Sequence, residues 1–135
     1  MYPILKFEYN IHFLTYEEAG VRMLTKEELP ECPVATTVQL IGSKWKLLIM
    51  RNLLQRPWRF NELRKTLPGI SQKVLTDSLR SMEADGIVTR TVYPEAPPRV
   101  EYCLSKLGET MRPIIKCMEA WGTDYKQTWE SGPPA

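Results

Sequence analysis

The sequence predicts an α+β, mainly helical fold, and three observations support this. Two short segments with helical spacing of apolar residues, 60–67 and 71–86, are separated by a turn. Two segments of alternating residues, 87–93 and 99–104, follow at once and are joined by a proline-containing loop. A longer helical pattern then runs from residue 105 to about residue 129. This order is typical of a winged helix-turn-helix with a two-stranded wing and a C-terminal dimerisation helix.

The region before the helix-turn-helix is also expected to be helical. The segment 34–41 has apolar residues on one side, and Gly42 is expected to end it. Ser43 can cap a following helix over 44–54, which must end before Pro57 because proline lacks the N–H to continue it. The residues expected to bury this second helix are Trp45, Leu48, Ile49 and Leu53.

The segment 71–86 has one apolar and one polar face. Pro68 and Gly69 favour a turn before it. Ser71 is a suitable N-cap, and Gly86 can end the helix with a positive φ. The apolar face consists of Leu75, Leu79 and Met82, and the polar face of Gln72, Lys73, Thr76, Asp77 and Arg80. Such donors and acceptors suit base edges and phosphates in a DNA major groove, although any amphipathic helix also has a solvated face.

Charge is unevenly distributed along the chain. The sequence has 18 Lys and Arg against 16 Asp and Glu, a net charge of +2. Residues 44–106 hold 12 of the basic and 6 of the acidic residues, a balance of +6, and the flanking segments together carry −4. Because the basic centre coincides with the helix-turn-helix, a polyanion is favoured as the partner.

The predicted wing contains two arginines, Arg90 and Arg99. Val88 and Val92 alternate with polar residues on the first strand, as expected for a half-buried hairpin. The loop 95–98 ends in two prolines, which would stiffen the segment that presents Arg99. Both arginines are candidates for phosphate contacts, and the alternative is a plain hairpin with solvated arginines.

The last predicted helix begins after the N-cap Ser105, and Pro113 is expected to kink it near Glu109. It carries an apolar seam with a heptad-like period. The seam is wider than one small domain must cover, so we expect part of it to bury against a second copy of the chain. A helix packed wholly on its own core is the alternative. The candidate dimer-interface residues are Leu107, Met111, Ile114, Met118, Trp121 and Tyr125.

The 135 residues suffice for one domain with arms. We assign residues 25–130 to that domain and residues 131–135 to a disordered tail. Within residues 1–24, the segment 5–13 alternates between apolar and polar residues, and this part of the chain fits an edge strand, an arm reaching a dimer partner, or translated upstream sequence. The single histidine, His12, is expected to be structural. The sequence has neither a membrane-spanning apolar run nor a signal peptide, so a cytoplasmic location is expected.

The three cysteines, Cys32, Cys103 and Cys117, fit neither a disulfide framework nor a zinc site. Cys117 is expected to be small and buried, and Cys103 to face away from the apolar side of its strand. Cys32 precedes a predicted helix, where the helix dipole can lower a thiol pKa and favour the reactive thiolate. It is therefore a redox-sensing candidate, and an unreactive cysteine is the alternative.

Several motifs resemble, in order along the chain, those of the HxlR-type transcriptional regulators: 32–34, 41–46, 59–63, 69–75, 79–86, 98–102 and 121–122. These are winged-helix proteins of bacteria and archaea, related in architecture to the MarR type, and the resemblance covers about residues 25–126. It implies a homodimer that represses or activates nearby genes, and sensing of electrophiles or oxidants through the cysteine at the position of Cys32. Ser43 departs from the glycine common in the family, and residues 1–24 have no recognised counterpart.

Together, these observations predict a sequence-specific, double-stranded DNA-binding regulator that is not an enzyme, because no phosphate loop, catalytic triad or metal cluster is present. No cofactor is expected. The predicted partners are a second copy of the chain and a near-palindromic operator, with an oxidant or small molecule as effector. A winged helix that docks a protein without binding DNA is the alternative. Ser71, Gln72, Lys73 and Thr76 are candidates for contacts with bases or nearby phosphates, and Arg59, Arg80, Arg90 and Arg99 for contacts with phosphates.

Overall fold

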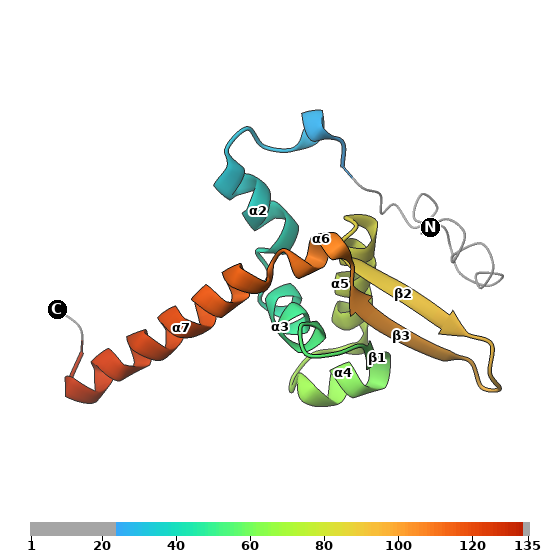
Figure 1. Ribbon diagram of the computed structural model, residues 1–135. Helices are drawn as coiled ribbons and strands as arrows, with labels where there is room; N and C mark the ends of the chain where they lie inside the picture. Colours follow the sequence, from blue (N-terminus) through green and yellow to red (C-terminus); the bar gives the residue numbers. More distant parts are fainter. Residues whose placement is uncertain (1–23, 134–135) are drawn as a thin grey trace.

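The computed structural model describes residues 24–133 (Figure 1). The interpretations of residues 1–23, including His12, lie outside this range, as do the last two residues of the expected tail. The elements are η1 (Lys26–Glu28), α2 (Pro33–Ile41), α3 (Lys44–Leu53), β1 (Trp58–Arg59), α4 (Phe60–Thr66), α5 (Gln72–Ala84), β2 (Val88–Tyr93), β3 (Arg99–Leu104), α6 (Lys106–Glu109), α7 (Arg112–Thr128) and η2 (Trp129–Ser131).

The core lies among α3, α4, α5 and the inner face of the sheet. Ile49 and Leu53 of α3 are buried as expected, and Trp45 and Leu48 pack half-buried against the same cluster. Met50 is also fully buried, which the expected apolar stripe did not include. The fully buried side chains from the other two helices are Leu63, Leu75, Leu79 and Met82. This apolar contact holds the two helices of the helix-turn-helix against α3.

The sheet has three antiparallel strands in the order β1-β3-β2. The wing strands β2 and β3 pair from Val88 opposite Leu104 to Tyr93 opposite Arg99, as the alternating pattern predicted. The short strand β1 adds Trp58 opposite Tyr102 and was not expected, because a two-residue strand has no periodicity to detect.

The C-terminal helix differs from its prediction. Ser105 does cap it, since the Ser105 hydroxyl accepts a hydrogen bond from the Gly108 N–H. However, Pro113 lies in the first turn of α7, so the chain forms two helices, α6 and α7, rather than one kinked helix. Beyond Ile115, its only buried residue among those described, α7 extends away from the body of the protein (Figure 1).

Candidate nucleic-acid interface

The turn between α4 and α5 and the start of α5 form as the sequence predicted. Gly69 has a φ of +89°, a region that glycine enters without strain. The Ser71 hydroxyl accepts from the Val74 N–H at 3.1 Å and so caps α5. Because Leu75 and Leu79 are buried on the opposite side, the capped end of α5 directs its polar face outward.

Three of the four candidates for base contacts, Ser71, Gln72 and Lys73, are exposed on the first turn, and Thr76 is half-buried one turn later. Lys73 Nζ lies 2.7 Å from Asp77 Oδ2, and 84% of the Lys73 side chain is exposed. A surface ion pair of this kind is worth only about 0–1 kcal/mol, so Lys73 can exchange Asp77 for a phosphate at small cost. The start of α5 therefore presents donors and acceptors suited to a DNA groove.

Arg90 does not reach the surface that the sequence analysis assigned to it. Its side chain lies on the same face of the sheet as Val88 and Val92, because side chains alternate along a strand, and that face points towards α5. The Arg90 Nε is 3.9 Å from Oε1 of the buried Glu83. The same alternation was visible in the sequence and could have excluded Arg90 as a phosphate contact.

Arg99 lies on the outer face of the wing, as expected, but its charge is already compensated. Its Nε donates to Glu95 Oε2 at 2.9 Å, and its Nη1 donates to Glu101 Oε2 at 3.0 Å. The guanidinium also lies 3.9 Å from the centre of the Tyr93 ring. The hydrogen bond with Glu95 is the main reason why the pKa of Arg99 is raised. A phosphate would have to compete with two carboxylates for this arginine.

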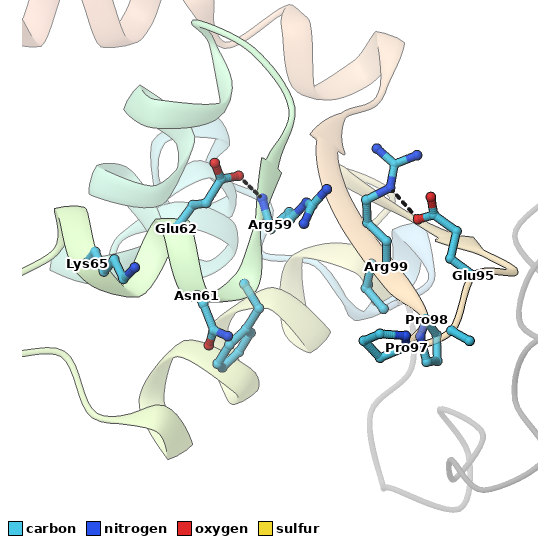
Figure 2. A pocket seen from close by; sticks show the side chains of 11 residues that line it. Arg59, Asn61, Glu62, Lys65, Glu95, Pro97, Pro98 and Arg99 are labelled. Atoms are coloured by element: carbon cyan, nitrogen blue, oxygen red, sulfur yellow. Dashed lines mark hydrogen bonds and ion pairs between the residues drawn. The ribbon is translucent and has the colours of Figure 1, made fainter.

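A cleft of about 680 Å³ separates α4 from the tip of the wing (Figure 2). Arg59 and Lys65 line the α4 side, and Pro97, Pro98 and Arg99 line the wing side. Charge analysis of the sequence counted Lys65 but did not single it out as a contact. Arg59, which precedes α4, Lys65 of α4 and Arg99 of the wing contribute positive charge to one opening, which suits a strand of the phosphate backbone.

Glu62, which also lines this cleft, is used within α4 itself. Its Oε1 accepts from the Arg59 N–H at 2.9 Å, and this hydrogen bond is the main reason why the pKa of Glu62 is lowered. Glu62 Oε2 is also 3.5 Å from Arg56 Nη2. The carboxylate therefore fixes the start of α4 and the backbone of Arg59. Arg80, the other candidate for the backbone, is half-buried on α5.

Much of the apolar seam is exposed. On α7, Ile114, Met118, Trp121 and Tyr125 are exposed, and Trp121 stacks on Tyr125 with ring centres 5.3 Å apart. Leu107 is exposed on α6. Met111 differs, because it packs half-buried against the protein's own core. A contiguous exposed face of large apolar side chains on a small domain is typical of protein–protein interfaces.

The three cysteines are free thiols. Cys32 is the N-cap residue of α2, in agreement with its predicted position before a helix, and it is exposed. Cys103 Sγ lies 2.9 Å from Thr89 Oγ1 on the neighbouring strand. Cys117 is exposed on α7, beside Ile114 and Met118, so the expectation that it is buried was wrong. The helix face that carries it is not covered by the rest of the protomer.

Within residues 24–133, no cluster of His, Cys, Asp or Glu could hold a metal ion. In the same part of the chain, every helix is too short or too polar to cross a membrane.

Comparison with known proteins gives consistent matches. A family model described as HxlR-like helix-turn-helix matches residues 40–130. The HTH-type transcriptional regulator YdeP of Bacillus subtilis (strain 168) is 44% identical over 102 residues, covering 76% of this chain and 80% of YdeP. The redox regulator HypR in its reduced form is 44% identical with a TM-score of 0.70, over 74% of this chain and 99% of that chain. The transcriptional regulator YodB from B. subtilis in its reduced form is 36% identical with a TM-score of 0.63, and the match covers 77% of this chain and 100% of the YodB chain.

Proposed function

Because this chain belongs to the HxlR-like helix-turn-helix family of transcriptional regulators, we propose that it binds a specific double-stranded DNA operator as a homodimer. The observation that carries the proposal is the capped start of α5, whose polar face is exposed while its apolar face is buried. A protein that binds an operator must be in the compartment that holds the chromosome. In a bacterium such as B. subtilis this is the cytoplasm, which is the proposed location.

In the proposed complex, α5 enters the major groove by its N-terminal end. Gln72 is the best candidate for reading a base, because its amide can bond an adenine edge with a donor and an acceptor together. Ser71, Lys73 and Thr76 contact neighbouring bases or phosphates. Two copies would place their α5 helices in successive major grooves, about 34 Å apart, on a near-palindromic site.

The cleft between α4 and the wing is the proposed seat of a DNA backbone strand. Arg59 and Lys65 hold phosphates from the α4 side, and Arg80 supports contacts along α5. Arg99 contributes once a phosphate replaces Glu95 as its partner. We leave Arg90 out of this set because its side chain faces α5.

The homodimer is proposed to form through the exposed apolar face of α7 and Leu107 of α6. Burial of Ile114, Met118, Trp121 and Tyr125 against a second copy would remove a large apolar area from water. Since Met111 is already packed on its own core, we expect it to contribute little to the interface.

We also propose that the thiolate of Cys32 reacts with an oxidant or electrophile and that this changes DNA binding. The support is its exposed position at the start of α2 and the likeness to HypR, a protein described as a redox regulator. Mass-spectrometric trapping with a thiol reagent before and after mild oxidant tests this. Cys32→Ser is expected to abolish the effect of oxidant on operator binding. If Cys32 stays unmodified in the oxidant-treated protein, the proposed redox-sensing role of Cys32 is refuted.

The test of the main proposal begins with selection of bound fragments from the source genome. Fluorescence anisotropy on a selected fragment then gives Kd over a salt series. A homodimer that neutralises several phosphates should show a log–log slope of about −0.9 for each phosphate. Gln72→Ala should reduce the preference for the selected fragment over scrambled DNA, by about ten-fold. No DNA binding at low salt would instead favour a protein-docking winged helix.

A further inference from the structure

Two charged side chains are buried between α5 and the first strand of the wing. Only 6% of the Glu83 side chain and 13% of the Arg90 side chain are exposed, and Glu83 Oε1 lies 3.9 Å from Arg90 Nε. Glu83 is in the last turn of α5 and Arg90 is the third residue of β2. The pair therefore connects the helix that carries the candidate base contacts with the strand that carries the wing.

The surroundings of this pair are protein groups rather than open solvent. Tyr102 lies opposite Arg90 in the β2–β3 register, on the face that packs against the core. Burial raises the pKa of Tyr102, whereas the charge of Arg90 lowers it and that of Glu83 raises it. Together with Arg80 of α5, whose charge also lowers the pKa of Tyr102, these three residues form one electrostatic cluster between the helix and the sheet.

Such a pair is poorly explained as a contribution to stability. Taking two charges out of water costs about as much as their attraction returns, and a well-packed apolar pair is often as stable. What a buried ion pair does impose is geometry, because each charge accepts few other arrangements. Here the elements that it restrains are the two that the proposed function brings onto DNA.

The segment between α5 and β2 holds the base of the wing against the end of the helix. Only three residues separate α5 from β2, and Gly86 among them has a φ of +78°. The Ser105 hydroxyl donates to the Gly86 carbonyl at 2.6 Å, and the Ile87 N–H donates to the Met82 carbonyl at 2.9 Å, so the first residues of the wing are fixed to the end of α5. In Figure 1, β2 leaves the C-terminal end of α5 and extends away from it. The Glu83–Arg90 pair adds a restraint further along β2, where it acts on the direction of the wing rather than on its base.

We propose that Glu83 and Arg90 are positioning residues that set the angle between α5 and the wing, so that both elements contact DNA together. The inference rests on the proposed function. A positioning role can be distinguished by measurement from a direct phosphate contact by Arg90. Loss of the negative charge of Glu83 should weaken DNA binding, whereas simple electrostatics predicts that removing an anion strengthens it.

The experiment uses Glu83→Gln, Arg90→Gln and the double variant in the full chain, with operator affinity measured by anisotropy. Each single variant is expected to bind on the order of ten-fold more weakly, a size typical of effects transmitted through packed elements. The double variant should lose no more than either single one, since both remove the same restraint. It removes both charges of the pair together, and thermal unfolding checks that all three variants fold. Glu119→Gln, an exposed glutamate of α7, is the control for loss of a negative charge alone.

Footprinting separates a positioning role from general loss of structure. Methylation protection of guanine N7 reports α5 in the major groove, and hydroxyl-radical protection reports the wing on the backbone. We expect the variants to keep the first and lose the second. The inference is overturned if Glu83→Gln binds as tightly as the wild type or more tightly. It is also overturned if the double variant keeps the wing footprint. Failure of the wild type to bind any DNA would refute the proposed function instead.

Discussion

Replacing Trp121 with alanine tests the proposed dimer face of α7 and has a magnitude that follows from the structure. In the protomer 68% of Trp121 is exposed, which for a residue of roughly 250 Å² is about 170 Å² available for burial in a dimer. Alanine would keep about a third of that area. At about 25 cal/mol per Å², each protomer then loses about 3 kcal/mol if the whole face is buried. The dimer loses about 6 kcal/mol, or about four orders of magnitude in Kd.

Sedimentation equilibrium over a protein concentration series measures this Kd, and anisotropy with labelled operator measures DNA binding on the same samples. The wild type should be dimeric at micromolar concentration, and Trp121→Ala should be monomeric and bind operator weakly, because half-sites are then bound one at a time. Lys116→Ala is the matched control, since Lys116 is exposed on the opposite side of α7. An unchanged dimer Kd for Trp121→Ala, or an equal loss for Lys116→Ala, would refute the reasoning.

Three further changes have expected outcomes. Glu95→Gln should tighten operator binding up to about five-fold in anisotropy titrations, because it releases Arg99 from a surface ion pair; weaker binding would contradict this. Gly108→Ala should lower the free energy of unfolding by about 2–3 kcal/mol in urea, because its Cβ would lie 2.2 Å from a backbone oxygen, whereas Gly122→Ala, with open space around it, should not destabilise. Burial raises the pKa of Asp85 in the folded protein above its value in the unfolded chain. Stability therefore falls as pH rises from below the unfolded pKa to above the folded one, and Asp85→Asn should raise Tm at pH 7 but not at pH 3.

Local signals predicted much of the fold correctly. The three serine caps, at Ser43, Ser71 and Ser105, each accept a backbone N–H three residues later, as proposed. The wing strands agree with their alternating pattern to within one residue. These features depend on residues within one turn or on one neighbouring strand, so a single sequence contains the information.

The candidate site was predicted less completely. The positions of Gln72 and Lys73 on an exposed helix face followed from periodicity alone. The pairing of Arg99 with Glu95 did not, since it depends on how the loop at the wing tip folds back towards β3. Lys65 became a candidate only when α4 was seen across a cleft from the wing.

The sequence by itself determined the order of the elements, the ends of most helices and the polar face of α5, because each depends on short-range hydrogen bonds and on periodicity. Only the tertiary structure decided that Arg90 pairs with Glu83 across two elements, that β1 joins the sheet, and that α7 leaves Trp121 uncovered. The physical reason is that burial and charge pairing depend on groups distant in the chain, whose approach is set by packing of the whole core.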